Sequence, residues 1–152
     1  MLRLLTSFFF ILALLLEPVS VQSQNDIRFD SCAGFSASVP ELMENAIIRT
    51  QIPARWNASQ SINQVFDGWL RPYIQKSAGG QINLSLLIFP DGSCCLYRIQ
   101  PNSNVRPNFL QLRKQVAQLQ WLPAYQNNTP VLTTKVLQLV FSGKTLRVIE
   151  LQ

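Results

Sequence analysis

The segment 80–141 constrains the fold more than any other part of the chain. Apolar residues recur at every second position over 82–88, which is the period of a β-strand that buries one face. Asp91 and Gly92 follow, the residue types that a tight hairpin turn prefers, and residues 93–100 return as a second strand. This segment therefore predicts an antiparallel hairpin.

A helical pattern follows the hairpin and then gives way to further strands. Pro107 suits the first turn of a helix, and apolar residues follow at helical spacing: Phe109, Leu112, Val116 and Leu119. Pro123 is expected to stop this helix, and strands are expected over 131–141 and 145–151. The expected fold class is α+β, with a small antiparallel sheet, made of the hairpin and a C-terminal strand, packed against an amphipathic helix.

A helical addition is expected before the hairpin. Ser38 begins a capping-box pattern, which predicts a helix over 39–50. A second helix is expected from Ser61, with a wide apolar stripe, and Pro72 should kink or end it.

Residues 1–23 read as a secretory signal peptide. Arg3 provides the positive start, 4–16 form an apolar run too short to span a membrane, and small residues precede the expected cleavage point. Export to the periplasm or out of the cell is therefore expected, and an uncleaved anchor is the alternative. The rest of the chain divides into an N-terminal helical segment over 24–79 and a second unit over 80–152.

Charge narrows the range of partners. The chain carries 13 Lys and Arg against 8 Asp and Glu, a net charge of +5, and its basic residues are scattered. Arg106, Arg113 and Lys114 come nearest to a cluster, which a solvated helix face explains better than a nucleic-acid site. Nucleic acid is therefore not an expected partner. The charge instead favours solubility, or attraction to an anionic envelope surface or an acidic partner segment.

Three cysteines, Cys32, Cys94 and Cys95, enter an oxidising compartment if the chain is exported. Adjacent cysteines in a strand point to opposite faces, so the expected bridge joins Cys32 to either Cys94 or Cys95, and we name Cys95. A regular strand would place Cys95, Tyr97 and Ile99 on one face, whereas a bulge near Cys94 would change which cysteine faces inward. Three free buried thiols are the alternative.

No catalytic, cofactor or metal site is expected. The chain has no histidine, which removes Ser–His and Cys–His nucleophilic pairs and the commonest metal ligand. Cys94 and Cys95 lack the spacing of a zinc or redox motif, and no glycine-rich phosphate loop occurs. An enzyme is therefore not expected, and a hydrolase that uses Cys94 or Cys95 is the most distant alternative.

The ordered markers of the segment 80–141 resemble a known family. They are Gly80, the Asp91–Gly92 turn, the Trp121-Leu122-Pro123-Ala124 corner, Pro130–Val131 and Phe141. Their order and spacing resemble the C-terminal domain of the TonB family of envelope energy transducers, over about half of the chain that follows the leader. The resemblance implies a non-enzymatic domain that grips an extended peptide by adding it to a sheet edge.

The resemblance also implies where a partner would bind. In that family the strand nearest the C-terminus is the edge that pairs with a short segment of an outer-membrane transporter. The corresponding residues are 131–140, and the contact candidates are Thr133, Thr134, Lys135 and Gln138. Pairing of 145–151 with this strand would block such binding, whereas a free edge would also favour a strand-paired homodimer.

The chain departs from a working transducer in two respects. Its leader reads as cleavable where a transducer keeps a membrane anchor, and no long Pro-rich spacer precedes the first helix. The leading expectation is therefore a free-standing protein- or peptide-binding module, and a membrane is a partner only if the leader is retained. The alternatives are a membrane-anchored transducer-like component for outer-membrane transport and a small secreted structural or inhibitor-like protein.

Overall fold

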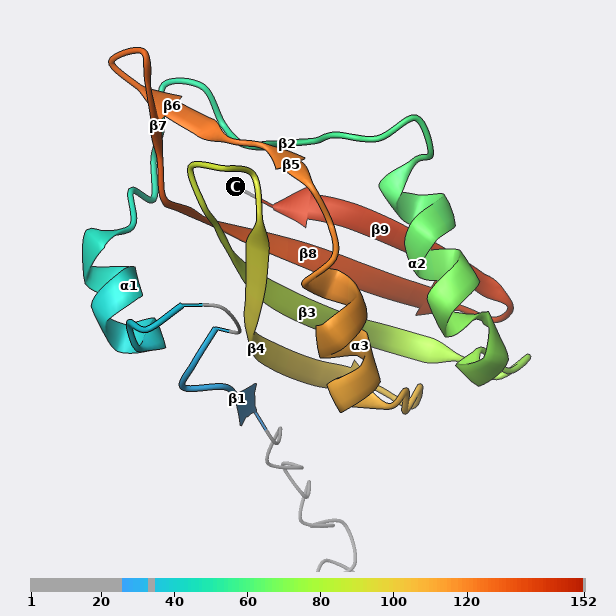
Figure 1. The fold of residues 1–152 in the computed structure, drawn as a ribbon. Helices are drawn as coiled ribbons and strands as arrows, with labels where there is room; N and C mark the ends of the chain where they lie inside the picture. The colour runs from blue at the N-terminus through green and yellow to red at the C-terminus, as the bar shows by residue number, and fades with distance from the viewer. Residues whose placement is uncertain (1–25, 33–34, 152) are drawn as a thin grey trace, which may run out of the picture.

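A computed structural model describes residues 26–32 and 35–151, and the expected leader lies outside this part of the chain. A five-stranded antiparallel sheet forms its centre, in the order β1-β4-β3-β8-β9 (Figure 1). Its strands are β1 (Ile27–Arg28), β3 (Gly79–Ile88), β4 (Cys94–Ser103), β8 (Thr133–Ser142) and β9 (Thr145–Leu151). β3 pairs with β4 and β8, which are the second hairpin strand and the C-terminal strand expected from the sequence.

Glycine turns connect the strand pairs. Gly92 has a φ of 84° in the turn between β3 and β4, and Gly143 has a φ of 58° between β8 and β9. Glycine adopts such positive φ values without steric cost. In the first turn the Ser93 amide also donates to the Asp91 carboxylate at 2.9 Å, which holds the hairpin closed.

Two helices cover one face of the sheet (Figure 1). α2 (Ile62–Leu70) contacts β9, and α3 (Phe109–Val116) contacts β4. Their buried residues meet the alternate apolar residues of the sheet in one core, which includes Phe66, Leu70, Ile82, Leu84, Leu86, Leu112, Val116, Leu137 and Leu139. Residues from 24–79 and from 80–152 therefore share this core and, through β1, the same sheet.

α1 (Val39–Asn45) packs against one end of the opposite face, where Val39 joins Leu87, Phe89 and the Cys32–Cys95 pair. Its capping box at Ser38 is present as expected. The expected extension of this helix to residue 50 is wrong. The Ile47 amide instead donates to the Leu132 carbonyl at 2.9 Å, so pairing with distant chain replaces the helical hydrogen bonds.

α2 ends at Leu70, before Pro72, as the sequence predicts, and Pro72 lies in a single 3-10 turn, η1 (Arg71–Tyr73). The expected end of α3 at Pro123 is wrong, because the helix stops at Val116. Trp121 then enters β5 (Trp121–Leu122), which pairs with β2 (Arg55–Trp56), and its amide donates to the Gly92 carbonyl at 2.8 Å.

A small hairpin follows, formed by β6 (Ala124–Gln126) and β7 (Thr129–Val131). Asn127 and Asn128 turn it with φ values of 51° and 61°. Asparagine is one of the few non-glycine residues that tolerates this conformation.

β4 contains a bulge at Tyr97, because Ser85 pairs with Arg98 while Leu86 pairs with Leu96. The extra residue changes the alternation, so that Ile99 faces the helix-covered core and Cys95 faces α1. The regular-strand expectation that Cys95, Tyr97 and Ile99 share one face is therefore wrong.

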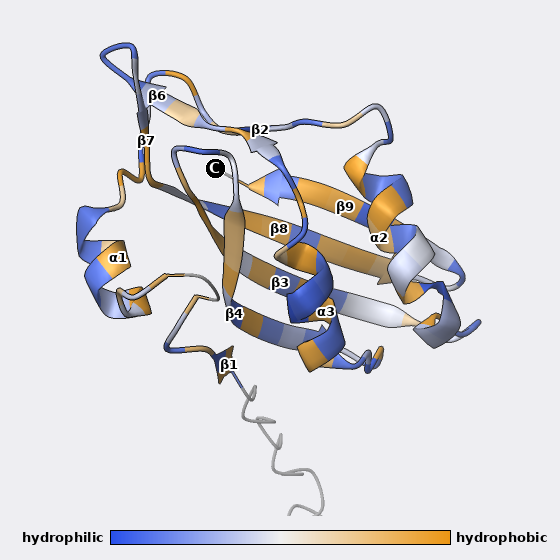
Figure 2. Ribbon diagram, viewed as in Figure 1, coloured by the Kyte–Doolittle hydropathy of each residue, from blue (hydrophilic) through white to orange (hydrophobic). Residues whose placement is uncertain are grey.

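The architecture is α+β, with an antiparallel sheet packed against an amphipathic helix and an N-terminal helical addition, as the sequence predicts. Figure 2 shows hydrophobic residues along the strands and on the helix sides that meet them. Across the described ranges 26–32 and 35–151, no helix combines the length and the apolar character needed to span a bilayer.

Candidate peptide-binding edge

The strand expected to offer a free edge, β8, lies inside the sheet. It pairs with β3 along 133–142 and with β9 along 136–142. The expectation of a free edge at residues 131–140 is therefore wrong over most of this strand. The alternative stated from the sequence is correct instead, because residues 145–151 form a strand that pairs with β8 and covers its edge.

The four contact candidates on β8 have separate surroundings. Thr133 is buried, bridges to Ile47 and donates its hydroxyl to the Ile47 carbonyl at 2.7 Å. Thr134 is half-buried and pairs with Leu87 of β3. Gln138 pairs with strands on both sides, and its side-chain amide donates to Asn83 at 3.3 Å.

Lys135, the remaining candidate, points into the helix-covered side of the sheet, and its side chain is only 10% exposed. Its Nζ donates to the Ala54 carbonyl at 2.9 Å and lies 2.7 Å from the Glu150 carboxylate. The ammonium group also lies 5.4 Å from the centre of the Trp121 ring, within the range of a cation–π interaction. Lys135 thus joins β8, β9 and the segment around Ala54.

The outer edge of the sheet is β9. Asn63 of α2 covers its first half: the Asn63 side-chain N–H donates to the Leu146 carbonyl at 3.3 Å, and the Val148 amide donates to the Asn63 oxygen at 2.8 Å. This side chain takes the place of a peptide group of a neighbouring strand. It protects the start of the edge from further pairing.

The second half of β9 is open. Peptide groups alternate sides along a strand, so Glu150 points its amide and carbonyl away from β8, as Leu146 and Val148 do. Within the described residues, no hydrogen bond reaches the Val148 carbonyl or the Glu150 peptide groups. The ion pair between Lys135 and the Glu150 side chain lies beside this edge, on the helix-covered face of the sheet.

Aliphatic residues lie beside the open half of β9, on the sheet face away from α2 and α3. They are Val136 and Val140 of β8 and Ile149 and Leu151 of β9, which alternate with residues of the buried core. The first three are half-buried, and Leu151 is 38% exposed. A partly exposed aliphatic group on the sheet face away from α2 and α3, next to peptide groups without partners among the described residues, is the arrangement that an added strand would complete.

The opposite edge of the sheet is better protected. β1 pairs with β4 at residues 98 and 99, and the Phe29 amide donates to the Tyr97 carbonyl at 2.9 Å. Further along β4, Pro101 has no amide hydrogen to offer a new strand. Asp26 beside β1 pairs with Arg98, and the hydrogen bond from Arg98, with a further one from Arg28, holds the pKa of this carboxyl below its usual range although desolvation opposes the shift.

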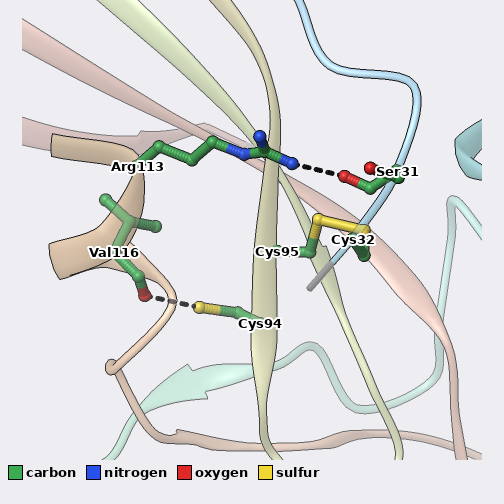
Figure 3. Close-up of a disulfide and its surroundings, with 6 residues drawn as sticks. All are labelled: Ser31, Cys32, Cys94, Cys95, Arg113 and Val116. Carbon is green, nitrogen blue, oxygen red and sulfur yellow. Dashed lines mark hydrogen bonds between the residues drawn. A yellow bond between two sulfur atoms is a disulfide. The ribbon is translucent and has the colours of Figure 1, made fainter. Parts of the chain in front are cut away.

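The disulfide anchors the lead-in segment across this protected side. Cys32 is bonded to Cys95, and Figure 3 shows Cys95 and Cys94 on opposite sides of β4. Arg113 of α3 reaches the same segment, donating to the Ser31 carbonyl and lying 4.0 Å from the centre of the Phe29 ring. The bridge is one of the two that the sequence left open.

Cys94 is the free thiol beside this bridge, and it is buried against α3. Its sulfur lies 3.0 Å from the Val116 carbonyl (Figure 3). Burial raises the pKa of Cys94 to about 11, and a weak interaction with the Trp121 indole partly opposes the rise. The indole nitrogen itself is buried and makes no hydrogen bond of normal geometry. A protonated, buried thiol is a poor nucleophile, so this site gives no basis for hydrolase chemistry.

Two shallow hollows of about 230 and about 250 Å³ lie near the end of α2 and the β8–β9 turn, away from the open half of β9. Tyr73 and Arg106 line the first, and Asp67, Arg71 and Lys144 line the second. Neither contains a cysteine or a pair of carboxylates. Among the described residues, no group of three or more His, Cys, Asp and Glu side chains is arranged to hold a metal ion.

Two features of the region around β8 and β9 were missed from the sequence: the contact of Asn63 with β9 and the burial of Lys135. Asn63 gave no signal, because a polar residue in the first turn of a helix is ordinary. The burial of Lys135 did give a signal, because this residue alternates with Leu137, Leu139 and Phe141, which places it on their buried face.

In comparisons with known proteins, no family model, curated protein or solved structure matches this chain.

Proposed function

We propose that the protein is an exported, non-enzymatic module that binds an extended segment of a partner protein at the open half of β9. The observation that carries this proposal is the coincidence of two features. Among the described residues the Val148 carbonyl and the Glu150 peptide groups have no hydrogen-bond partner, and the aliphatic residues Ile149 and Leu151 lie directly beside them. The Cys32–Cys95 disulfide is compatible with an oxidising compartment.

The size of the open edge determines what the partner must provide. An added strand would gain three main-chain hydrogen bonds, and each contributes a net of about 0.5–1.5 kcal/mol. Their sum falls short of the roughly 8 kcal/mol that micromolar affinity requires. Apolar side chains of the partner must therefore supply much of the rest by packing on Ile149 and Leu151.

This requirement sets the expected sequence of the partner. Side chains of an added strand alternate between the two faces of the sheet, so apolar residues are expected at every second position. Arg147 is exposed on the same face as Ile149, and an acidic residue near it would be favoured. The TonB-type resemblance agrees with binding by strand addition, although it places the bound segment on a different strand.

The test is selection of linear peptides from a displayed library against the protein, followed by affinity measurements on two matched variants. Glu150→Pro and Glu150→Ala both remove the carboxylate that pairs with Lys135, but only proline removes the outward amide. Selected peptides should bind the alanine variant nearly as well as wild type and should bind the proline variant at least tenfold more weakly.

A third variant tests the aliphatic contribution. Leu151→Ser should weaken the same peptides severalfold, because it removes an exposed apolar contact without changing the main-chain groups. Equal binding to the proline and alanine variants would show that the edge is not used. Failure to select any extended peptide would also refute the proposal.

A further inference from the structure

One end of the sheet collects basic side chains from segments that are far apart in the sequence. They are Arg71 and Lys76 after α2, Arg106 in the loop before α3, and Lys144 and Arg147 at the start of β9. All five are exposed. This group, the basic end, lies where α2 ends, β3 begins and β8 turns into β9 (Figure 1).

One backbone hydrogen bond and two side-chain hydrogen bonds hold these segments together. The Gly143 amide donates to the Ala78 carbonyl at 2.8 Å, which joins the β8–β9 turn to the start of β3. Arg71 donates to the Lys144 carbonyl at 3.2 Å. The Asn104 side chain donates to the Ser77 carbonyl at 2.8 Å and brings in the loop before α3. The basic end is therefore a fixed feature of the fold.

The charge at this end is strongly unbalanced. Its five cations face a single carboxylate, Asp67, which pairs with Arg71, so the local net charge is 5 − 1 = +4. The other described residues contain seven cations and six carboxylates, a net charge of +1. Nearly all the excess positive charge of the described chain thus lies at one end of the sheet, although the basic residues look scattered in the sequence.

Exposed apolar side chains accompany these cations. Tyr73 is 39% exposed and lines a hollow with Arg106, and Leu110, in the first turn of α3, is 65% exposed. Tyrosine is favoured at the boundary between lipid headgroups and hydrocarbon, and basic residues with exposed aliphatic neighbours are typical of surfaces that lie on membranes.

We propose that the basic end docks the protein on an anionic lipid surface. The cations come from separate turns, and only Arg71 and Lys144 line one hollow together, which fits a flat array of headgroups better than one acidic peptide. Attraction to anionic lipid contributes roughly a fivefold gain in partitioning for each nearby cation.

This surface and the open half of the peptide-binding edge lie at opposite ends of β9, and Arg147 is the basic residue that flanks both. β9 starts at the basic end with Thr145 and runs away from it to Leu151, so the open half of the edge lies at the far end of the strand. A protein held by its basic end would keep that edge accessible to a partner. Either proposal can therefore fail without the other.

The test is cosedimentation with lipid vesicles. Full-length protein, freed of its leader if processing occurs, is mixed with vesicles of phosphatidylcholine alone or with added phosphatidylglycerol. We expect binding to the anionic vesicles only, with a large loss between about 0.1 M and about 1 M salt, where the Debye length falls from about 10 to about 3 Å.

Two double variants with equal charge loss make the test specific. Lys76→Ala with Lys144→Ala removes two cations of the basic end and should lower partitioning about 25-fold. Arg49→Ala with Lys114→Ala removes two exposed cations elsewhere and should have a much smaller effect. Circular dichroism and thermal melting confirm that both remain folded.

Three results would overturn the proposal. The first is equal binding of wild type to neutral and anionic vesicles, and the second is an equal loss in the two double variants. The third is binding to soluble polyglutamate as tight as binding to anionic vesicles, with the same dependence on Lys76 and Lys144. That result would assign the basic end to an acidic protein segment.

Discussion

Loss of the disulfide is the perturbation whose effect follows most directly from the structure. Cys32 and Cys95 are 63 residues apart, so breaking their bond releases a loop of that size in the unfolded chain. The chain-entropy relation gives such a cross-link a stabilisation of about 4 kcal/mol at 25 °C. Replacing both cysteines with alanine should therefore lower the free energy of unfolding by about this amount.

Urea titration followed by tryptophan fluorescence measures the change. With a slope of about 1–3 kcal/mol per M for a small domain, the midpoint should fall by roughly 1–4 M. Wild type treated with a reductant should behave like the double variant. Cys94→Ala is the control, because it removes one buried sulfur without opening a loop and should cost only about 1 kcal/mol. A loss below about 1 kcal/mol in the double variant would refute the loop-entropy reasoning.

Three further perturbations test other parts of the fold. Asn63→Ala should lower the free energy of unfolding by about 1–3 kcal/mol in urea titrations, because two hydrogen bonds to β9 are lost. Gly92→Ala should lower it by about 2 kcal/mol, since φ is 84° and the new Cβ meets the Trp121 carbonyl, whereas Gly68→Ala, with open space around it, should be neutral or stabilising in the same assay. Hydrogen bonds from Ser93 lower the pKa of Asp91. The stabilisation of the fold by this carboxylate is therefore complete above its pKa in the unfolded chain, about 3.9, and is lost as pH falls through its pKa in the folded protein. Acid titration of stability should accordingly be steeper for wild type than for Asp91→Asn.

The strands that the sequence predicts best are those whose local pattern agrees with their environment. β3 alternates from Ile82 to Leu86 in its apolar residues because one face meets α2 and α3, whereas Leu87 is buried on the other face beside α1, and its turn has glycine where positive φ is needed. β9 was also expected at the observed residues. In these segments, local preference and tertiary packing favour the same conformation.

The wrong predictions occur where pairing with a segment that is distant in the sequence replaces local structure. α1 stops early because Ile47 pairs beside β8, and α3 stops early because Trp121 enters β5 against β2. The bulge at Tyr97 changes which face of the sheet the β4 side chains occupy, and no local sequence pattern predicts it. Such pairings depend on contacts between residues far apart in the chain, which the hydrophobic period does not encode.

The candidate site shows the same division. Alternation in β8 and the presence of a following strand were both readable, but the order of strands in the sheet decides which one is the edge. That order depends on β9 folding back on β8 and on Asn63 covering part of it. The resemblance suggested a binding mode, and because β8 is internal in the sheet, the proposed binding strand is β9.

Amide hydrogen exchange at Glu150 tests the central claim most directly. In the free protein this amide should exchange as an unprotected one, while the Ile149 amide, which faces Gln138 of β8, should be protected. A saturating selected peptide should slow exchange at Glu150 and leave Ile149 nearly unchanged. Protection of Glu150 in the free protein, or bound peptide without any slowing there, would contradict strand addition at this edge.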